Sequence, residues 1–155
     1  RSWNFDVSNQ GWRYHMSNIM AAIGIEQLKK MNTFADIRKK IAIMYDKLLS
    51  LNPNIVFLNR DYKSVVPHIY VIRISNLFDR EGLKDAMEKK GIEIGVHYKP
   101  NHMLTFFKTK KKINLPVTDK LYEEIISLPI HPNISNTDIH YVVKTLTELI
   151  PKFFK

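Results

Sequence analysis

Cysteine is absent from the 155 residues, so neither a disulfide bond nor a thiolate-based metal site can form. Glycine occurs only five times, and no glycine-rich loop of the kind that binds phosphate groups is present. The chain also lacks the Gly-x-Ser-x-Gly motif of serine hydrolases and any apolar run near the ~20 residues of a membrane-spanning helix. No secretory signal pattern opens the sequence. We therefore expect a cytoplasmic protein that is not bound to a membrane.

The chain has fewer acidic than basic residues. Lysine and arginine number 24 against 15 acidic residues, which gives a formal net charge of +9. Such a balance favours partners that carry phosphate. The cations are spread over separate runs, at 38–40, 89–90 and 108–112, as on a solvated surface, whereas a nucleic-acid site usually gathers them in one stripe. We expect no nucleic-acid partner, although a stand-alone basic module for nucleotides or nucleic acid stays open as an alternative.

The most unusual stretch runs from Gly11 to Gly24. Ser17 can cap a helix, and Arg13 and His15 lie just before the positive end of that helix, where an anion would be favoured. From Ile19 to Ile25 nearly every side chain is apolar, whereas a helix that packs on one core shows only an apolar stripe. Another surface must therefore cover the rest of this helix.

The remaining pattern predicts alternating helices and short strands. A second helix should begin at Asn32-Thr33 and end at Asn52-Pro53-Asn54, with Ile37, Ile41, Met44, Leu48 and Leu51 facing inward. Strands are expected at 55–58, 65–74 and 92–98, and helices after Asp79, around 121–128 and after Ser135. This order predicts an α+β fold, with a small, mostly antiparallel sheet covered by helices.

Histidines offer the only obvious chemistry. His97 and His102 flank Pro100, but a metal site needs a third ligand that no recognisable spacing supplies, so we expect no metal. The alternation of residues 92–98 directs His97 away from the core, where its imidazole could simply bond a backbone group. His131, between two prolines, could pin a turn. On the residues alone, a structural role and a site role both stay open.

Four segments together resemble one enzyme family. They are Gly-Trp-Arg-Tyr-His-Met-Ser-Asn-Ile-Met-Ala-Ala-Ile-Gly-Ile-Glu-Gln-Leu, Val-Pro-His-Ile-Tyr-Val-Ile-Arg, Gly-Ile-Glu-Ile-Gly-Val-His-Tyr-Lys-Pro-Asn-His and Leu-Pro-Ile-His-Pro-Asn-Ile-Ser. In this order they resemble the last part of the DegT/DnrJ/EryC1/StrS family of sugar aminotransferases. The resemblance implies the C-terminal small domain of a fold-type I enzyme at 32–155, preceded by an interdomain and dimer-interface segment at 1–31.

The resemblance also implies an activity. Enzymes of this family use pyridoxal 5′-phosphate (PLP) to move an amino group from glutamate to a nucleotide-linked keto sugar, for polysaccharide and other amino-sugar biosynthesis, and they work as homodimers. Their Schiff-base lysine lies in an upstream domain that this chain does not contain. We therefore expect the chain alone to be inactive and not to bind the cofactor. A dehydratase of the same family, with histidine in place of that lysine, is the alternative enzyme.

The resemblance assigns roles to five residues. Arg13 and His15 match the segment that reaches the cofactor phosphate in the neighbouring subunit. His97 and Tyr98, with His102, match the loop that lines the sugar-nucleotide side of the pocket. No residue of the chain is expected to be catalytic by itself.

Overall fold

The structure of the protein is a computed structural model that describes residues 9–12, 14–107 and 113–154. Its backbone divides into two compact units, Arg1–Asn32 and Thr33–Lys155. The sequence placed a boundary between residues 31 and 32. The roles predicted for the two parts, an interface segment and a small domain, remain predictions.

The longest element is helix α1, Asn18–Leu49. It begins where the sequence predicted, because the Ser17 hydroxyl accepts a hydrogen bond from the backbone N–H of Met20 at 3.3 Å. The expected break at Asn32-Thr33 is wrong, since the helix runs through it without interruption. Asparagine and threonine cost less than about 0.7 kcal/mol each inside a helix, and no proline or glycine stands there to end it.

Exposure differs between the two ends of α1. In the first unit the large apolar side chains are exposed, among them Ile19, Met20, Ile23, Ile25, Leu28 and Met31. In the second unit α1 buries Ile41, Ala42, Tyr45 and Leu49. Leu51, predicted to face inward, lies beyond the end of the helix and is 86% exposed. The apolar excess noted in the sequence is thus confined to the first unit.

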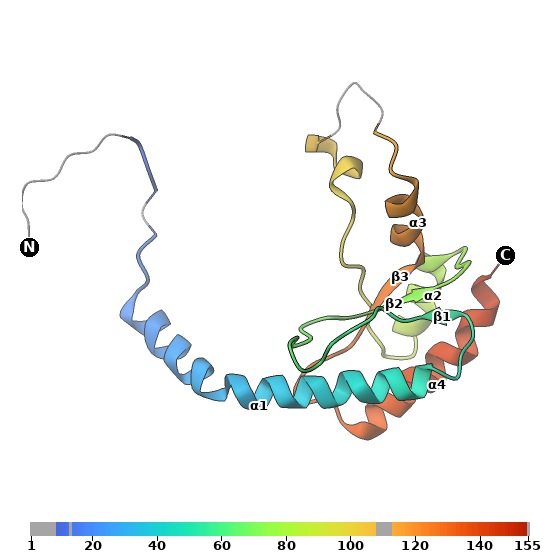
Figure 1. Ribbon diagram of the computed structural model, residues 1–155, viewed down its shortest axis with the longest axis horizontal. Coiled ribbons are helices and arrows are strands. Elements are labelled where there is room, and N and C mark those ends of the chain that lie inside the picture. The colour runs from blue at the N-terminus through green and yellow to red at the C-terminus, as the bar shows by residue number, and fades with distance from the viewer. Residues whose placement is uncertain (1–8, 13, 108–112, 155) are drawn as a thin grey trace, which may run out of the picture. The chain divides into compact units, whose positions relative to one another are not determined.

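The sheet of the second unit has three antiparallel strands in the order β1-β2-β3 (Figure 1). The strands are β1 (Ile55–Val56), β2 (Tyr70–Ile74) and β3 (Ile125–Leu128). Ile55 pairs with Ile74, and Ile72 pairs with Ile126. The small antiparallel sheet with packed helices confirms the predicted α+β class.

One strand prediction and the end of one helix prediction were wrong. Residues 92–98 form no strand, although Gly95 makes an isolated antiparallel bridge with Ser127. Ile92 and Ile94 are buried while Glu93 is exposed, so the predicted alternation holds over these three residues, but Gly95, Val96 and His97 are all half-buried and do not continue it. Residues 125–128, predicted as the end of a helix, are β3, because a short apolar run fits both periods and pairing with β2 decides between them.

Two of the remaining helices begin at side-chain caps, and a third has a proline in its first turn and no such cap. Helix α2 is Arg80–Glu88, where the Asp79 side chain accepts from the backbone N–H of Gly82 at 2.8 Å. Helix α3 is Pro116–Glu124, and α4 is Asn136–Leu149, which begins with the predicted capping box of Ser135 and Asp138. Three short 3₁₀ turns complete the list: η1 (Asn101–Met103), η2 (Thr105–Phe107) and η3 (Ile150–Phe153).

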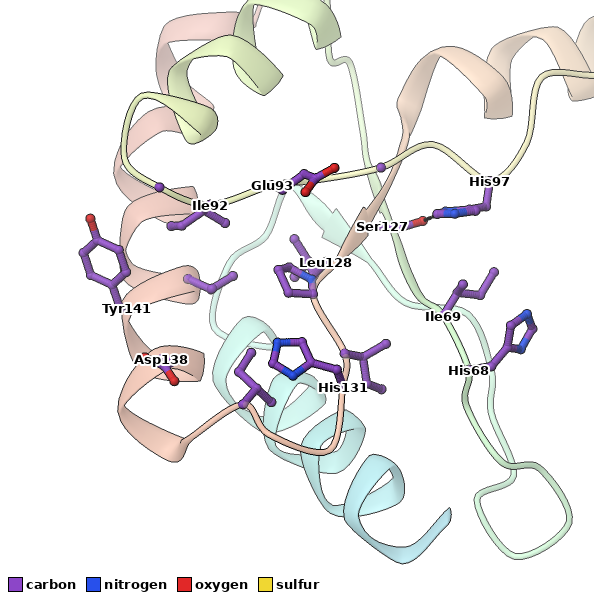
Figure 2. Close-up of a pocket in the computed structure, with 16 residues that line it drawn as sticks. His68, Ile69, Ile92, Glu93, His97, Ser127, Leu128, His131, Asp138 and Tyr141 are labelled. Carbon is purple, nitrogen blue, oxygen red and sulfur yellow. Dashed lines mark hydrogen bonds between the residues drawn. The ribbon is translucent and has the colours of Figure 1, made fainter. Parts of the chain in front are cut away.

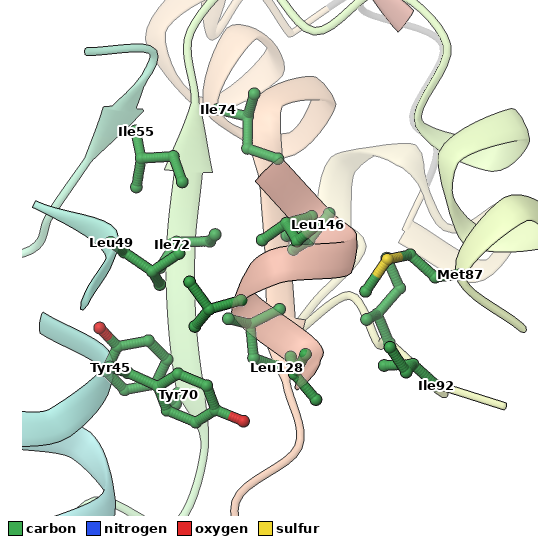
Figure 3. Packing of buried hydrophobic residues seen from close by; sticks show 14 of the residues in the cluster. Tyr45, Leu49, Ile55, Tyr70, Ile72, Ile74, Met87, Ile92, Leu128 and Leu146 are labelled. Carbon is green, nitrogen blue, oxygen red and sulfur yellow. The ribbon is translucent and has the colours of Figure 1, made fainter. Parts of the chain in front are cut away.

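The core joins α1, β2, α2 and α4 (Figure 3). The rings of Tyr45 on α1 and Tyr70 on β2 stack with centroids 4.9 Å apart. Both side chains are fully buried, as are Ile72, Met87 and Leu146. Burying each such aliphatic side chain stabilises the fold by about 1.5–3 kcal/mol. This packing fixes the positions of α1, β2, α2 and α4 within the second unit.

Candidate functional site

A cavity of about 560 Å³ opens in the second unit beside β3 (Figure 2). Its walls come from the two residues before β2, from residues 91–97, from the end of β3 and the segment that follows it, and from the first turns of α4. Three histidines line it, His68, His97 and His131, together with the acidic side chains of Glu93 and Asp138. Segments that are distant in the sequence therefore meet at one concave surface.

His97 is the most firmly held of these histidines. Its Nδ1 lies 2.8 Å from the hydroxyl oxygen of Ser127, a buried residue of β3. The ring also passes close over Gly95, where an added Cβ would lie only 2.9 Å from Cε1 of His97. The imidazole is half-buried, and its partner is a side chain, not the backbone group that the structural interpretation of the sequence expected.

Side chains of helix α1 donate hydrogen bonds to backbone carbonyl groups in two other walls of the cavity. Arg38 donates hydrogen bonds to the carbonyl oxygens of His68 at 3.0 Å and Ile130 at 2.9 Å. Tyr45 donates its hydroxyl hydrogen to the carbonyl oxygen of Pro129 at 2.9 Å. Burial is the larger cause that raises the pKa of Tyr45, with repulsion from Asp138 second, so its hydroxyl remains a donor. The segments that carry His68 and His131 are thereby fixed to one helix.

The charge of the cavity is not that of a polyanion site. No lysine or arginine is among the residues that line it, whereas Glu93 and Asp138 are. Hydrogen bonds from the hydroxyl and the backbone N–H of Ser135 lower the pKa of Asp138, so this carboxyl is ionised near neutral pH. Imidazoles, carboxylates and the nearby Tyr141 suit a neutral ligand with many hydroxyl groups better than a phosphate chain.

The predicted substrate residues separate into two groups. Tyr98 follows His97 and is 70% exposed, and its ring meets the imidazole edge-on with centroids 4.8 Å apart. His102 instead lines a different cavity of about 440 Å³. There its Nε2 lies 2.7 Å from Oδ1 of Asp119 on α3. The structure thus brings His97 and Tyr98 together, whereas His102 lies at the second cavity.

The two residues predicted to contact the cofactor phosphate belong to the first unit. Arg13 lies outside the residues that the structure describes. His15 is exposed and precedes α1. Their predicted role at a cofactor phosphate therefore stays a prediction.

Neither a metal nor a complete cofactor site is formed by the described side chains. Within residues 9–12, 14–107 and 113–154, no group of three histidine, aspartate or glutamate residues could hold a metal ion. No lysine lines the cavity, so its walls do not supply the amine that would bond the aldehyde of PLP. The residues present do not fit the whole cofactor.

Sequence reasoning missed Ser127, which it had placed in a helix. The available signal was a single polar residue within an apolar run that ends at Pro129. His131, for which the sequence left a role in a turn open, lines the cavity with His97, and so does His68.

Comparison with known proteins assigns the chain to an enzyme family. A model of the DegT/DnrJ/EryC1/StrS aminotransferase family matches residues 1–147. The chain belongs to this family. A UDP-4-amino-4,6-dideoxy-N-acetyl-beta-L-altrosamine transaminase of Campylobacter jejuni is 33% identical over 100% of the chain and 42% of its own length. The chain therefore spans less than half of this relative.

Solved structures of aminotransferases share the fold. A putative sugar aminotransferase of Streptococcus pneumoniae, Spr1654 in its PLP form, superposes with a TM-score of 0.88 at 28% identity, over 99% of this chain and 41% of that one. The aminotransferase PseC of Helicobacter pylori, involved in pseudaminic acid biosynthesis by its description, has the same fold with a TM-score of 0.83 at 23% identity. In the part of the chain that the structure describes, no helix is long and apolar enough to cross a membrane.

Proposed function

We propose that this chain is the substrate-facing part of a PLP-dependent aminotransferase that acts on a nucleotide-linked keto sugar, with glutamate as amino donor. The observation that carries the proposal is the 33% identity over the whole chain to a transaminase of a UDP-linked amino sugar. PLP, when bound, would supply the electron-withdrawing group that transfer of an amino group needs. The residues of this chain bind and orient the sugar.

The chemistry of the cavity supports a sugar as the bound group. Carboxylates of Glu93 and Asp138 can accept hydrogen bonds from sugar hydroxyls, and histidine can donate to oxygen atoms. His97 contacts the substrate directly, and Tyr98 provides an exposed ring beside it. His102 contributes by attaching the loop after Tyr98 to α3 through Asp119.

The cofactor is held by residues outside this cavity. Arg13 and His15 contribute a guanidinium and an imidazole near the cofactor phosphate, as anions are favoured near the start of a helix. The reactive lysine belongs to a part of the enzyme that this chain does not span. The purified chain alone should therefore keep no PLP after borohydride reduction, which mass spectrometry would show. A lysine of this chain carrying reduced cofactor would refute this part of the proposal.

A titration tests the sugar-binding role. We would add UDP-N-acetylglucosamine, a stable nucleotide sugar, to the ¹⁵N-labelled chain and follow each residue by NMR. Shifts concentrated at His97, Tyr98 and the cavity walls are expected. Shifts spread over the lysine-rich surfaces, together with salt-dependent retention on a polyanion column, would instead support the alternative of a basic nucleic-acid module.

The apolar start of α1 supports a second copy as partner. Six large apolar side chains between Ile19 and Met31 are exposed, more than a soluble monomer usually presents on one helix. We expect a homodimer through this surface, which light scattering would detect. A monomer at high concentration that binds no hydrophobic dye would contradict it.

A further inference from the structure

Ser127 is placed to control how His97 meets a ligand. It is 5% exposed and lies on β3, where two backbone hydrogen bonds with Gly95, of 3.0 and 2.8 Å, fix its position. Its hydroxyl oxygen lies 2.8 Å from Nδ1 of His97, a contact visible as the dashed line in Figure 2. The rigid strand thus sets the location of a group that bonds one nitrogen of the imidazole.

The direction of this hydrogen bond follows from counting protons. If Nδ1–H donated to Ser127, the hydroxyl hydrogen would have no acceptor among the described residues, and Ser127 is only 5% exposed to water. A buried donor without a partner is unfavourable. If the Ser127 hydroxyl donates to Nδ1, both groups are satisfied. In neutral imidazole the proton then resides on Nε2.

Nε2 is available for a ligand. Among the described residues His97 makes no second hydrogen bond, and no buried side-chain nitrogen or oxygen lacks a partner. Nε2 therefore reaches solvent. Glycine at position 95 leaves room for the imidazole, because a Cβ at that position would lie 2.9 Å from Cε1 of His97 and displace the ring.

We propose that Ser127 is a positioning residue that holds His97 as the Nε2–H tautomer, so that the imidazole offers the ligand a hydrogen-bond donor and not a general base. The tautomer is a property of this chain alone. That the donor meets an oxygen atom of a nucleotide sugar rests on the function proposed above.

Nitrogen NMR of the histidine rings tests the tautomer directly. The ¹⁵N-histidine-labelled chain would be studied about two pH units above the ordinary histidine pKa of ~6.5. The His97→Gln variant identifies the His97 signals. We expect a pyrrole-type shift for Nε2 and a pyridine-type shift for Nδ1. The opposite assignment in the wild-type protein would overturn the proposal without any further variant.

Variants then test the cause. In Ser127→Ala the two nitrogen shifts should converge as the tautomers mix, and in Ser127→Thr, which keeps the hydroxyl, they should stay apart. Thr145→Val, which removes the hydroxyl of another buried residue outside the cavity, should leave the His97 signals unchanged. Unchanged His97 shifts in a folded Ser127→Ala protein would refute the role of Ser127.

Binding separates this proposal from the proposed function. We expect Ser127→Ala to bind UDP-N-acetylglucosamine about five- to tenfold more weakly than the wild type, and Ser127→Thr to restore the affinity. If the wild type shows the Nε2–H tautomer but does not bind the nucleotide sugar, the positioning role stands and the ligand is wrong. If binding occurs with equal affinity in a folded Ser127→Ala protein, the positioning role is wrong.

Discussion

Replacing Arg73 by methionine tests how strongly a buried ion pair ties α3 to the sheet. Arg73 Nε lies 2.6 Å from Oε2 of Glu124, whose Oε1 accepts from the backbone N–H of Asn76 at 3.1 Å. The Glu124 side chain is 5% exposed, against 29% for Arg73. Leaving a buried charge without its partner typically costs about 3–5 kcal/mol. Because Arg73 is partly exposed and Asn76 keeps its hydrogen bond, we expect the lower end, about 3 kcal/mol.

This pair also makes stability depend on pH. Burial raises the pKa of Glu124, but the hydrogen bonds from Arg73 and Asn76 and the attraction of Arg73 outweigh it, so the pKa lies below its ordinary value of 4.5. The unfolded chain then binds this proton more tightly than the folded protein does. The stabilisation is therefore complete above pH 4.5 and is lost as the pH falls below it. A protonated Glu124 needs no cation, so the difference between wild type and Arg73→Met should shrink in acid.

Urea unfolding followed by circular dichroism, at neutral pH and through the acid range, measures both effects. Lys84→Met is the control, because Lys84 pairs with Glu81, which is 67% exposed, and such a pair contributes about 0–1 kcal/mol. In the double variant Arg73→Met/Glu124→Leu, part of the stability should return, since no buried charge remains. A loss below about 1 kcal/mol in Arg73→Met, or a loss that does not change with pH, would refute the reasoning.

Two further substitutions probe the frame of the cavity by the same unfolding measurement. Tyr45→Phe leaves the carbonyl oxygen of Pro129 without its donor and should cost about 1–2 kcal/mol, whereas Tyr141→Phe, at an exposed hydroxyl, should cost less than about 0.5 kcal/mol. Equal losses in the two variants would contradict the importance of the first bond. Gly91→Ala should cost about 1–2 kcal/mol, because Gly91 has a φ of 75°, while Gly24→Ala in the interior of α1 should stabilise the helix. Stabilisation by Gly91→Ala would show that the positive φ is not required.

Capping residues explain which helices could be predicted. The hydroxyl of Ser17 and the box of Ser135 with Asp138 act on backbone groups only three residues away, so their effect is written in the local sequence. The points at which a helix ends are harder to predict from the sequence. Asn32-Thr33 has capping residues but continues as helix, because such residues are tolerated inside a helix when nothing else ends it.

Strands were less predictable because pairing is not local. Residues 92–94 alternate in burial as predicted, yet the segment 92–98 makes only one bridge, and 125–128 become β3 through pairing with β2. A short apolar segment fits either a strand or a helix until a neighbouring strand offers hydrogen-bond partners.

The site shows the same division. From the motif around His97 the sequence identified the imidazole and Tyr98 as candidates for substrate binding. It could not identify Ser127, which is 30 positions away and has an ordinary residue type. Nor could it show that His102 is engaged by Asp119 and lines another cavity.

By itself, the sequence determined the absence of thiol chemistry, the starts of the helices that have side-chain caps, the burial of Ile92 and Ile94 and the motifs of an aminotransferase family. These depend on residue type and on spacings of a few residues. Tertiary structure alone decided that Arg38 would bridge to Ile130, 92 positions away, and that Ser127 would meet His97. Such contacts arise only when the core has packed, because the entropy lost in joining distant segments is recovered by burial of the whole domain and not by any one pair.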